Sequence, residues 1–199
     1  MVIMLNRTAI NLAFASQTGT YNTIMVNMAP GDNADSLCVS TLQLFLHDML
    51  KELYFAQVAI DTSFTSTEGQ VSSPKLETIL KNHSLINLNH EKRLTTIFNL
   101  LDIPVEYKDS VHVTALLVET ENHLNMCAKD RITWEITLII SARKVARYKM
   151  TAYEVASHLA IILGHTQVAT LLAVSAQEEE EFILRFLDGL THEFSAPKT

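Results

Sequence analysis

The sequence predicts an all-α fold, a bundle of four long helices and one shorter helix, and three observations favour this class. The chain has 199 residues, 48% of them hydrophobic, which is enough to bury a sizeable core. It contains only 5 Gly and 4 Pro, too few for the many tight turns of a sandwich or barrel. From Asp35 onward, apolar residues recur at steps of three and four, the spacing of one helix face.

The first 33 residues differ from the rest of the chain. Thr and Asn are frequent there, Gly19 and Gly31 interrupt the pattern, and the segment TIMVNM alternates weakly before a Pro-Gly turn. We expect residues 1–33 to form an arm, with a short strand as one option, and residues 34–195 to form the helical bundle. The opening MLNRTAINLAFASQ is a poor secretory signal, because Asn11 interrupts its apolar run.

The first helix is expected to begin at Asp35 or Ser36, since either side chain can cap a helix, and the segment TSFTSTEGQVSSP ends it. The second helix begins at Pro74, after the capping residue Ser73, and ends near Leu101. The inner stripe of the first helix is Leu42, Leu46, Met49, Leu53, Gln57, Ile60 and Phe64. That of the second is Leu76, Ile79 or Leu80, His83, Asn87, His90, Leu94, Ile97 and Leu101.

After a break at DIPVEYKDS, caused by Pro104, a shorter helix covers about residues 110–126. A long fourth helix is expected from Arg131 to Leu163, where Gly164 ends it as a left-handed cap. A fifth runs from about residue 165 to 193. The fourth helix has the stripe Ile132, Ile136, Ile139, Ala142, Ala146, Lys149 or Met150, Tyr153, Ala156 and Ala160. The fifth has Val168, Leu172, Ser175, Glu179, Phe182, Phe186 and Leu190.

Each long helix carries a polar residue near the middle of its inner stripe, which predicts a shared polar layer. Helical bundles build carboxylate-bridged di-iron sites in this way, from Glu residues and Glu-x-x-His pairs on facing helices. Here most of the carboxylates are absent. The polar members of the stripes are Gln57, His83, Asn87, His90, Lys149 and Glu179, with Glu178 next to the last.

Four segments resemble the YciF-like family of the ferritin-like superfamily. They are LQLFLHDMLKELYFAQ, HSLINLNHEKRLTTIFNLLDI, ARKVARYKMTAYEVASHLAIILGH and ATLLAVSAQEEEEF, and they cover about residues 42–194 in the family's order and spacing. The third is the most specific, because the family has Lys-Val-Glu-His-Tyr-Glu followed by Ala-x-Tyr and a Leu-Gly stop. The resemblance implies a ferritin-like four-helix bundle with one extra shorter helix.

The resemblance also implies the loss of a di-metal centre. Gln57 stands where the family has a metal-binding Glu, and Leu85 and Ile86 replace an acidic pair, although His90 remains. The family's Glu-His-Tyr-Glu has become Ala146, Arg147, Tyr148 and Lys149, and only the glutamates of the last helix remain. We therefore expect no metal and no cofactor. The alternative is iron or manganese held by the residual candidates His83, His90, Glu178 and Glu179.

Without a metal, an inward-facing Glu179 would be an unpaired buried carboxylate, which costs several kcal/mol. A cation must then take the place of the metal. Lys149, helped by Arg147, is the candidate, and it is expected to pair with Glu179 or Glu178. The former site is therefore predicted to be a layer of Gln57, Asn87, Ala146, Lys149 and Glu179.

The remaining patterns do not indicate a reaction. There is no Gly-x-Ser-x-Gly elbow, phosphate-binding loop or His-Glu-x-x-His helix, and Cys127 four residues after His123 has no third group to orient it. We expect no catalytic residues. The net charge of −7 argues against nucleic-acid binding, and no apolar run is long enough to span a membrane. Two widely separated cysteines indicate a reducing compartment, the cytoplasm.

Two functions remain open on the sequence. The first is a structural or interaction protein that forms a dimer or a larger homo-oligomer, with the arm as one docking element. The second is a metal-dependent oxidoreductase or stress-related protein of the YciF-like type.

Overall fold

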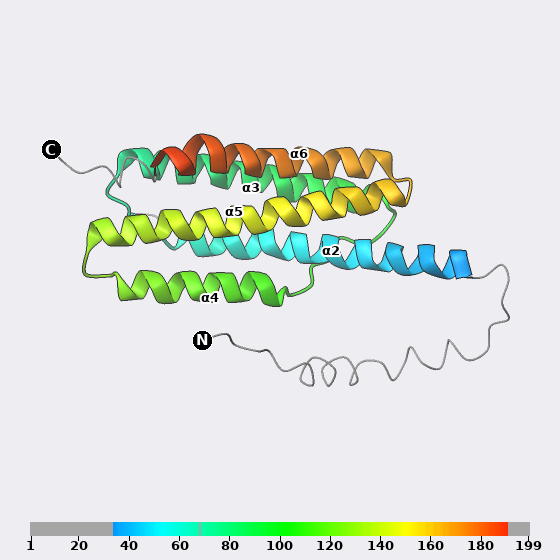
Figure 1. Ribbon diagram of the computed structural model, residues 1–199, viewed down its shortest axis with the longest axis horizontal. Helices are drawn as coiled ribbons and strands as arrows, with labels where there is room; N and C mark the ends of the chain where they lie inside the picture. Colours follow the sequence, from blue (N-terminus) through cyan, green and yellow to red (C-terminus); the bar gives the residue numbers. More distant parts are fainter. Residues whose placement is uncertain (1–33, 68, 191–199) are drawn as a thin grey trace, which may run out of the picture. The chain divides into compact units, whose positions relative to one another are not determined.

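The computed structural model describes residues 34–67 and 69–190, all of whose regular elements are helices (Figure 1). The arm 1–33, with its candidate strand TIMVNM, lies outside the described residues. The chain divides into two compact units, residues 1–41 and 42–199. The elements are α2 (Ala34–Thr65), α3 (Pro74–Leu100), α4 (Val111–Met126), α5 (Arg131–Ile162), α6 (Thr166–Phe182) and the π-helical turn η1 (Ile183–Leu187).

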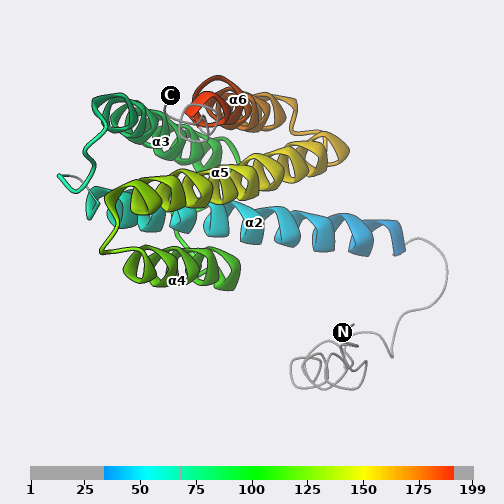
Figure 2. The ribbon, with the colours of Figure 1, turned by 60° about the vertical axis from the view of Figure 1, so that its left-hand side comes forward.

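Within the second unit, α2 from Leu42 onward, α3, α5 and α6 run side by side, and α4 lies outside them next to α2 and α5 (Figures 1 and 2). The all-α bundle with one shorter helix is therefore confirmed. None of the described helices is long and apolar enough to cross a membrane. Both cysteines, Cys38 and Cys127, are free thiols.

The ends of α3 and α5 follow the predicted signals, whereas α2 begins at Ala34 and already includes Asp35 and Ser36, the two residues expected to cap it. Ser73 accepts a hydrogen bond from the Leu76 amide at 3.3 Å ahead of Pro74, and Asp130 caps α5 in the same way. Gly164 has a φ of +78° and ends α5 in the left-handed conformation, as expected. The chain turns after α3 at Asp102, with a φ of 54°, two residues before the predicted breaker Pro104.

The interior contains two main apolar clusters at different levels along the bundle. The first includes Leu46, Leu50, Leu94, Phe98, Tyr153, Ala156 and Leu172, and the second includes Leu76, Ile79, Leu138, Ile139, Phe182, Ile183 and Leu187. Along α3, α5 and α6 the polar stripe residues fall between the members of these two clusters. The helices therefore hold a polar layer with an apolar core on either side.

Two predicted stripe positions are wrong. Ile132 is 49% exposed, because the buried face at the start of α5 is formed by Trp134 and Leu138. Phe186 is 38% exposed, whereas Ile183 and Leu187 are buried. The reason is the π-helical turn: it spaces its bonds by five residues rather than four, and so changes which positions face the core.

Candidate functional site

The polar layer is centred on an ion pair between α5 and α6. Lys149 Nζ lies 2.5 Å from Glu179 Oε1, and both side chains have no solvent exposure. The same ammonium donates a hydrogen bond to Asn87 Oδ1 on α3 at 2.5 Å. The cation predicted to compensate Glu179 is therefore in place, and its two contacts link α5 to α3 and α6.

Two histidines of α3 contact the glutamates of α6. His83 Nε2 lies 3.2 Å from Glu179 Oε2, and its ring stacks on Phe182 with 3.8 Å between ring centroids. His90 Nε2 lies 2.8 Å from Glu178 Oε2, and His90 Nδ1 lies 3.4 Å from Glu179 Oε1. Burial lowers the pKa of His90 to about 4, so the ring is neutral near pH 7 and donates its Nε2 proton to Glu178.

Arg93 is a second cation of the polar layer, partly buried, and the sequence pattern did not predict it. Its Nη1 and Nη2 donate to the two carboxylate oxygens of Glu178 at 2.9 and 3.1 Å, and Nη1 also donates to Ser175 Oγ at 2.6 Å. Arg93 follows His90 by three residues and so lies beside the inner stripe of α3, and its closeness to that stripe is the only signal in the sequence. Arg147, the predicted helper of Lys149, is exposed, because its position on α5 turns away from the layer.

The charges of the layer balance one another. Burial alone would raise the pKa of Glu179, but the Lys149 charge and the contact with His83 outweigh it, so its pKa lies well below the usual range. The hydrogen bond from His90, together with Arg93, lowers the pKa of Glu178 to about 2. Both glutamates are therefore ionised near neutral pH. Burial lowers the pKa of Lys149, and the attraction of Glu179 opposes that shift.

Gln57 and Ala146 complete the predicted layer. Gln57 is buried and donates to the hydroxyl of Tyr153 at 3.0 Å, while its Oε1 has no hydrogen-bond partner among the described residues. Tyr153 in turn lies edge-on to His90, with 5.2 Å between ring centroids. Ala146 is fully buried but belongs to the second apolar cluster, beside the layer.

The donor set does not fit a dinuclear metal centre. The Lys149 ammonium occupies the approach to Glu179 Oε1, and both oxygens of Glu178 accept from Arg93. His90 uses its Nε2 as a donor to Glu178 rather than as a ligand. In the two described stretches, no group of three or more His, Cys, Asp or Glu is arranged to hold a metal ion. Two metal ions need several carboxylates free to coordinate.

Other titratable groups, including the sequence candidates His123 and Cys127, lie away from the layer. His112 is exposed and stacks on Tyr148, and His123 is half-buried near the end of α4. Cys127 accepts a hydrogen bond from Thr137 at 3.5 Å.

Comparisons with known proteins agree with this fold. A family model described as a domain of unknown function, DUF892, matches residues 41–193. The stress protein YciF of E. coli has a similar structure, with a TM-score of 0.73 and 20% identity, over 79% of this chain and 98% of that one. YcfI of Rhodopseudomonas palustris, for which a structural role has been suggested, gives a TM-score of 0.69 and 18% identity, over 79% of this chain and 95% of that one. No curated protein sequence matches the chain. The resemblance to the YciF-like family is confirmed.

Proposed function

The chain belongs to the DUF892 family, and from this membership we propose that it is a non-catalytic, ferritin-like helical bundle that acts by structure or by contact with other proteins. In this proposal an internal ion-pair network has replaced an ancestral dinuclear metal centre. The observation that supports it most is the position of Lys149. A fully buried ammonium bonded to Glu179 and Asn87 supplies the positive charge that a metal would otherwise provide.

The network also supports a stabilising rather than a catalytic role. A general acid or base needs a pKa near the working pH and access to substrate. The glutamates of the layer have pKa values far below neutrality, Glu179 and Lys149 have no exposure, and Glu178 is held by Arg93. Groups fixed in this way join helices α3, α5 and α6.

Metal content tests this proposal directly. The full chain, purified from cells grown with iron and manganese, is analysed for metals and by absorption spectroscopy. We expect far less than one metal ion per chain and no ligand-to-metal charge-transfer band in the absorption spectrum. About two iron or manganese ions per chain would overturn the proposal and favour a metal-dependent oxidoreductase. Lys149→Glu, which adds a carboxylate to the layer, serves as the comparison, since any uptake by this variant alone would show that the lysine excludes metal.

Self-association is the second part of the proposal, and an apolar patch on the outer side of α2 and α3 supports it. Val58 is 47% exposed, Leu85 62% and Leu88 46%. Hydrogen bonds between Tyr54 and Glu91 and between Asp61 and Ser84 set the two helices in register, so that Val58 and Leu88 lie at the same level.

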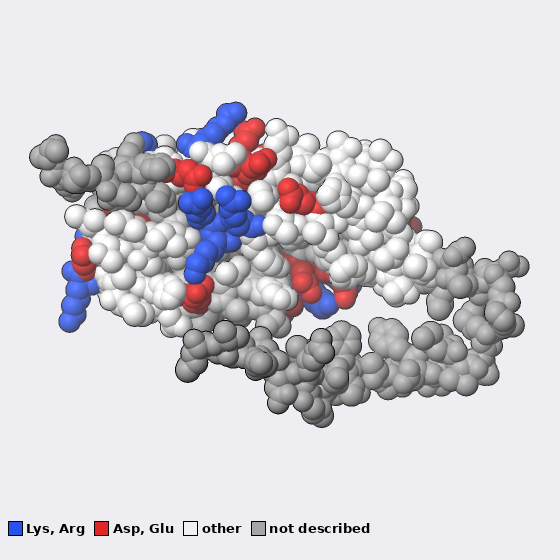
Figure 3. Space-filling view, in the orientation of Figure 1, with Lys and Arg blue, Asp and Glu red and all other residues white. Residues whose placement is uncertain are grey.

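The surface charge supports protein partners over nucleic acid. On the face shown in Figure 3, Lys and Arg side chains lie among Asp and Glu side chains, and wide areas carry no charge. The net charge of −7 also disfavours binding to nucleic acid, whose phosphates are negatively charged. Two free thiols are compatible with a reducing compartment such as the cytoplasm.

Sedimentation velocity tests the self-association. We expect the wild-type chain to sediment as a dimer or larger species, and Leu88→Lys to shift it toward the monomer. Leu100→Lys, the same change at an exposed position near the end of the same helix, is the matched control. A monomeric wild-type chain, or equal effects of the two variants, would contradict a role for the patch.

A further inference from the structure

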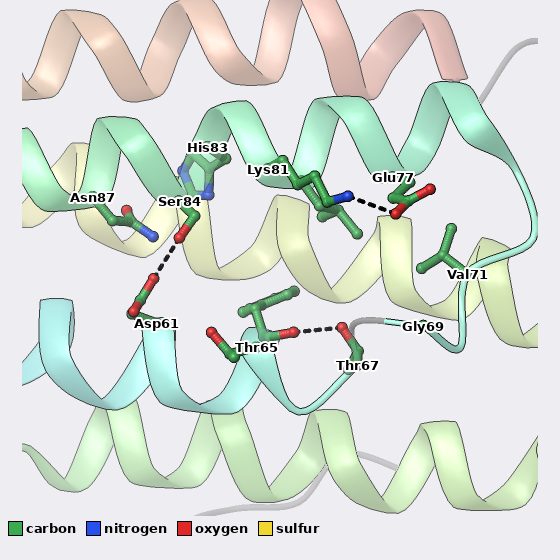
Figure 4. Close-up of a pocket in the computed structure, with 12 residues that line it drawn as sticks. Asp61, Thr65, Thr67, Gly69, Val71, Glu77, Lys81, His83, Ser84 and Asn87 are labelled. Atoms are coloured by element: carbon green, nitrogen blue, oxygen red, sulfur yellow. Dashed lines mark hydrogen bonds and ion pairs between the residues drawn. The ribbon is translucent and has the colours of Figure 1, made fainter.

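Two cavities flank the end of α2, and they differ in size. The one between α2 and α3, drawn in Figure 4, has a volume of about 30 Å³, which is room for about two water molecules. Its carboxylates are already engaged, since Asp61 accepts a hydrogen bond from Ser84 and Glu77 pairs with Lys81. The other cavity, between the ends of α2 and α4 and the start of α5, has a volume of about 430 Å³. That volume is within the range of small-molecule sites.

The inner surface of the larger cavity is mainly apolar. Leu124 at the end of α4 and Trp134 and Leu138 at the start of α5 line it, and all three are buried. Trp134 is the single tryptophan of the chain. An indole ring beside aliphatic side chains can cover the apolar face of a ring-shaped ligand.

The buried polar groups of this cavity are two acceptors and one donor. Thr67 Oγ1 donates its proton to Phe64 O at 2.7 Å (Figure 4). Thr120 Oγ1 donates its proton to Leu116 O at 2.8 Å, so both buried hydroxyls can only accept a further hydrogen bond. Trp134 Nε1 can only donate, and it has no acceptor among the described residues. A group that satisfies this set both donates and accepts, as a hydroxyl does and an ammonium or a carboxylate does not.

The mouth of the cavity favours a ligand without negative charge. Glu121 is exposed there, and the described residues that line the cavity include no Lys, Arg or His. An anion would therefore meet a like charge with no cation to offset it. The other polar groups nearer the surface are hydroxyls and amides, from Thr62, Ser63, Ser66, Gln70 and Asn125.

We propose that this cavity binds a neutral sugar, a pyranose of hexose size whose C–H face lies on Trp134 and whose hydroxyls bond to Trp134 Nε1, Thr67 and Thr120. Hydroxyls at the mouth donate to the Glu121 carboxylate, a charge-assisted bond. A hydrocarbon of the same size leaves the buried donor and acceptors without partners, which weakens its binding. The inference goes beyond the proposed function. It uses no residue of the polar layer, so it holds whether or not that layer binds metal.

Intrinsic fluorescence of the full chain tests this site, because Trp134 is the sole tryptophan and lines the cavity. The methyl glycosides of glucose, galactose and mannose are titrated, with glucuronate and cyclohexanol as an anionic and a hydroxyl-poor ring of similar size. We expect at least one glycoside to give a saturable change with a Kd on the order of 1 mM. Glucuronate and cyclohexanol should bind at least about tenfold more weakly.

Thr120→Val removes a buried acceptor but keeps the shape of the side chain, so the Kd should rise several-fold, up to about tenfold. Thr67→Val makes the same change on the opposite side of the cavity and should act in the same direction. Thr114→Val is the matched control, because Thr114 is an exposed residue of α4 outside the cavity, and it should leave the affinity unchanged.

Circular dichroism of the three variants checks that the fold is retained. The proposal is overturned if none of the three glycosides binds, or if glucuronate or cyclohexanol binds as tightly as the best glycoside. It is also overturned if neither Thr120→Val nor Thr67→Val weakens binding.

Discussion

Replacing Lys149 with methionine removes the ammonium from the polar layer but keeps a long side chain that fills similar space. Glu179 then remains buried with no lysine beside it. For charge centres about 4 Å apart and an effective dielectric constant near 20, the lost attraction is about 4 kcal/mol. Asn87 also loses its donor, while the desolvation cost of the lysine is recovered. We therefore expect the free energy of unfolding to fall by about 3 to 5 kcal/mol near pH 7.

The loss should depend on pH. In the variant, burial without the lysine raises the pKa of Glu179 above its unfolded value, so the folded state takes up a proton that the unfolded state has lost. Stability then decreases as pH rises above about 4.5, and the deficit should be smaller near pH 5 than near pH 7. Urea denaturation at both pH values, followed by circular dichroism, measures it.

Two further variants make this reasoning refutable. Lys144→Met, on the same helix as Lys149, removes an exposed ion pair with Glu119 of α4 and should cost much less than Lys149→Met. The double variant Lys149→Met with Glu179→Gln should recover at least about 2 kcal/mol relative to the sum of the single changes. If Lys149→Met costs no more than Lys144→Met, or if the two changes are additive, the ion pair does not hold the layer together.

Three other predictions concern the same fold. Arg93→Met should raise the pKa of Glu178 from about 2, seen by carboxyl ¹³C NMR titration, and cost about 1 to 2 kcal/mol, less than Lys149→Met, because Glu178 is 34% exposed. The pKa of His90, about 4 against a usual 6.5, means that the unfolded state binds its proton first, so stability falls as pH drops from 6.5 toward 4. His90→Gln should flatten that part of the urea-midpoint profile. Leu50→Ala, at a fully buried position, should cost about 2 to 5 kcal/mol in urea denaturation, whereas Leu44→Ala, at a position 66% exposed, should stay within about 0.5 kcal/mol.

Much of the fold could be predicted because the signals are local. Ser73 before Pro74 and Gly164 after α5 act through the backbone of one helix end, so sequence is enough to place them. The inner stripe of α3 follows directly from the helical period. The pairing of Lys149 with a glutamate of α6 could also be predicted, because a buried carboxylate on a stripe requires a cation on a facing stripe; that the partner is Glu179 rather than Glu178 comes from the structure.

The parts of the fold and of the polar layer that could not be predicted depend on features that no residue type indicates. The π-helical turn after Phe182 shifts the buried face, so the helical period predicts Phe186 in the core whereas Leu187 is the residue buried there. Arg93 lies beside the inner stripe rather than on it, and its long side chain reaches Glu178 from there. Which cation serves which carboxylate depends on helix rotation and on side-chain reach. Sequence spacing does not contain either quantity.

The burial of Lys149 makes its amine a chemical reporter. Acylating reagents modify unprotonated amines that they can reach, and Lys149 has no solvent exposure, whereas Lys144 on the same helix is 45% exposed. Modification of Lys149 therefore requires the helices around it to separate. Its labelling rate by mass spectrometry, relative to Lys144, reports how often the centre of the native bundle opens to water.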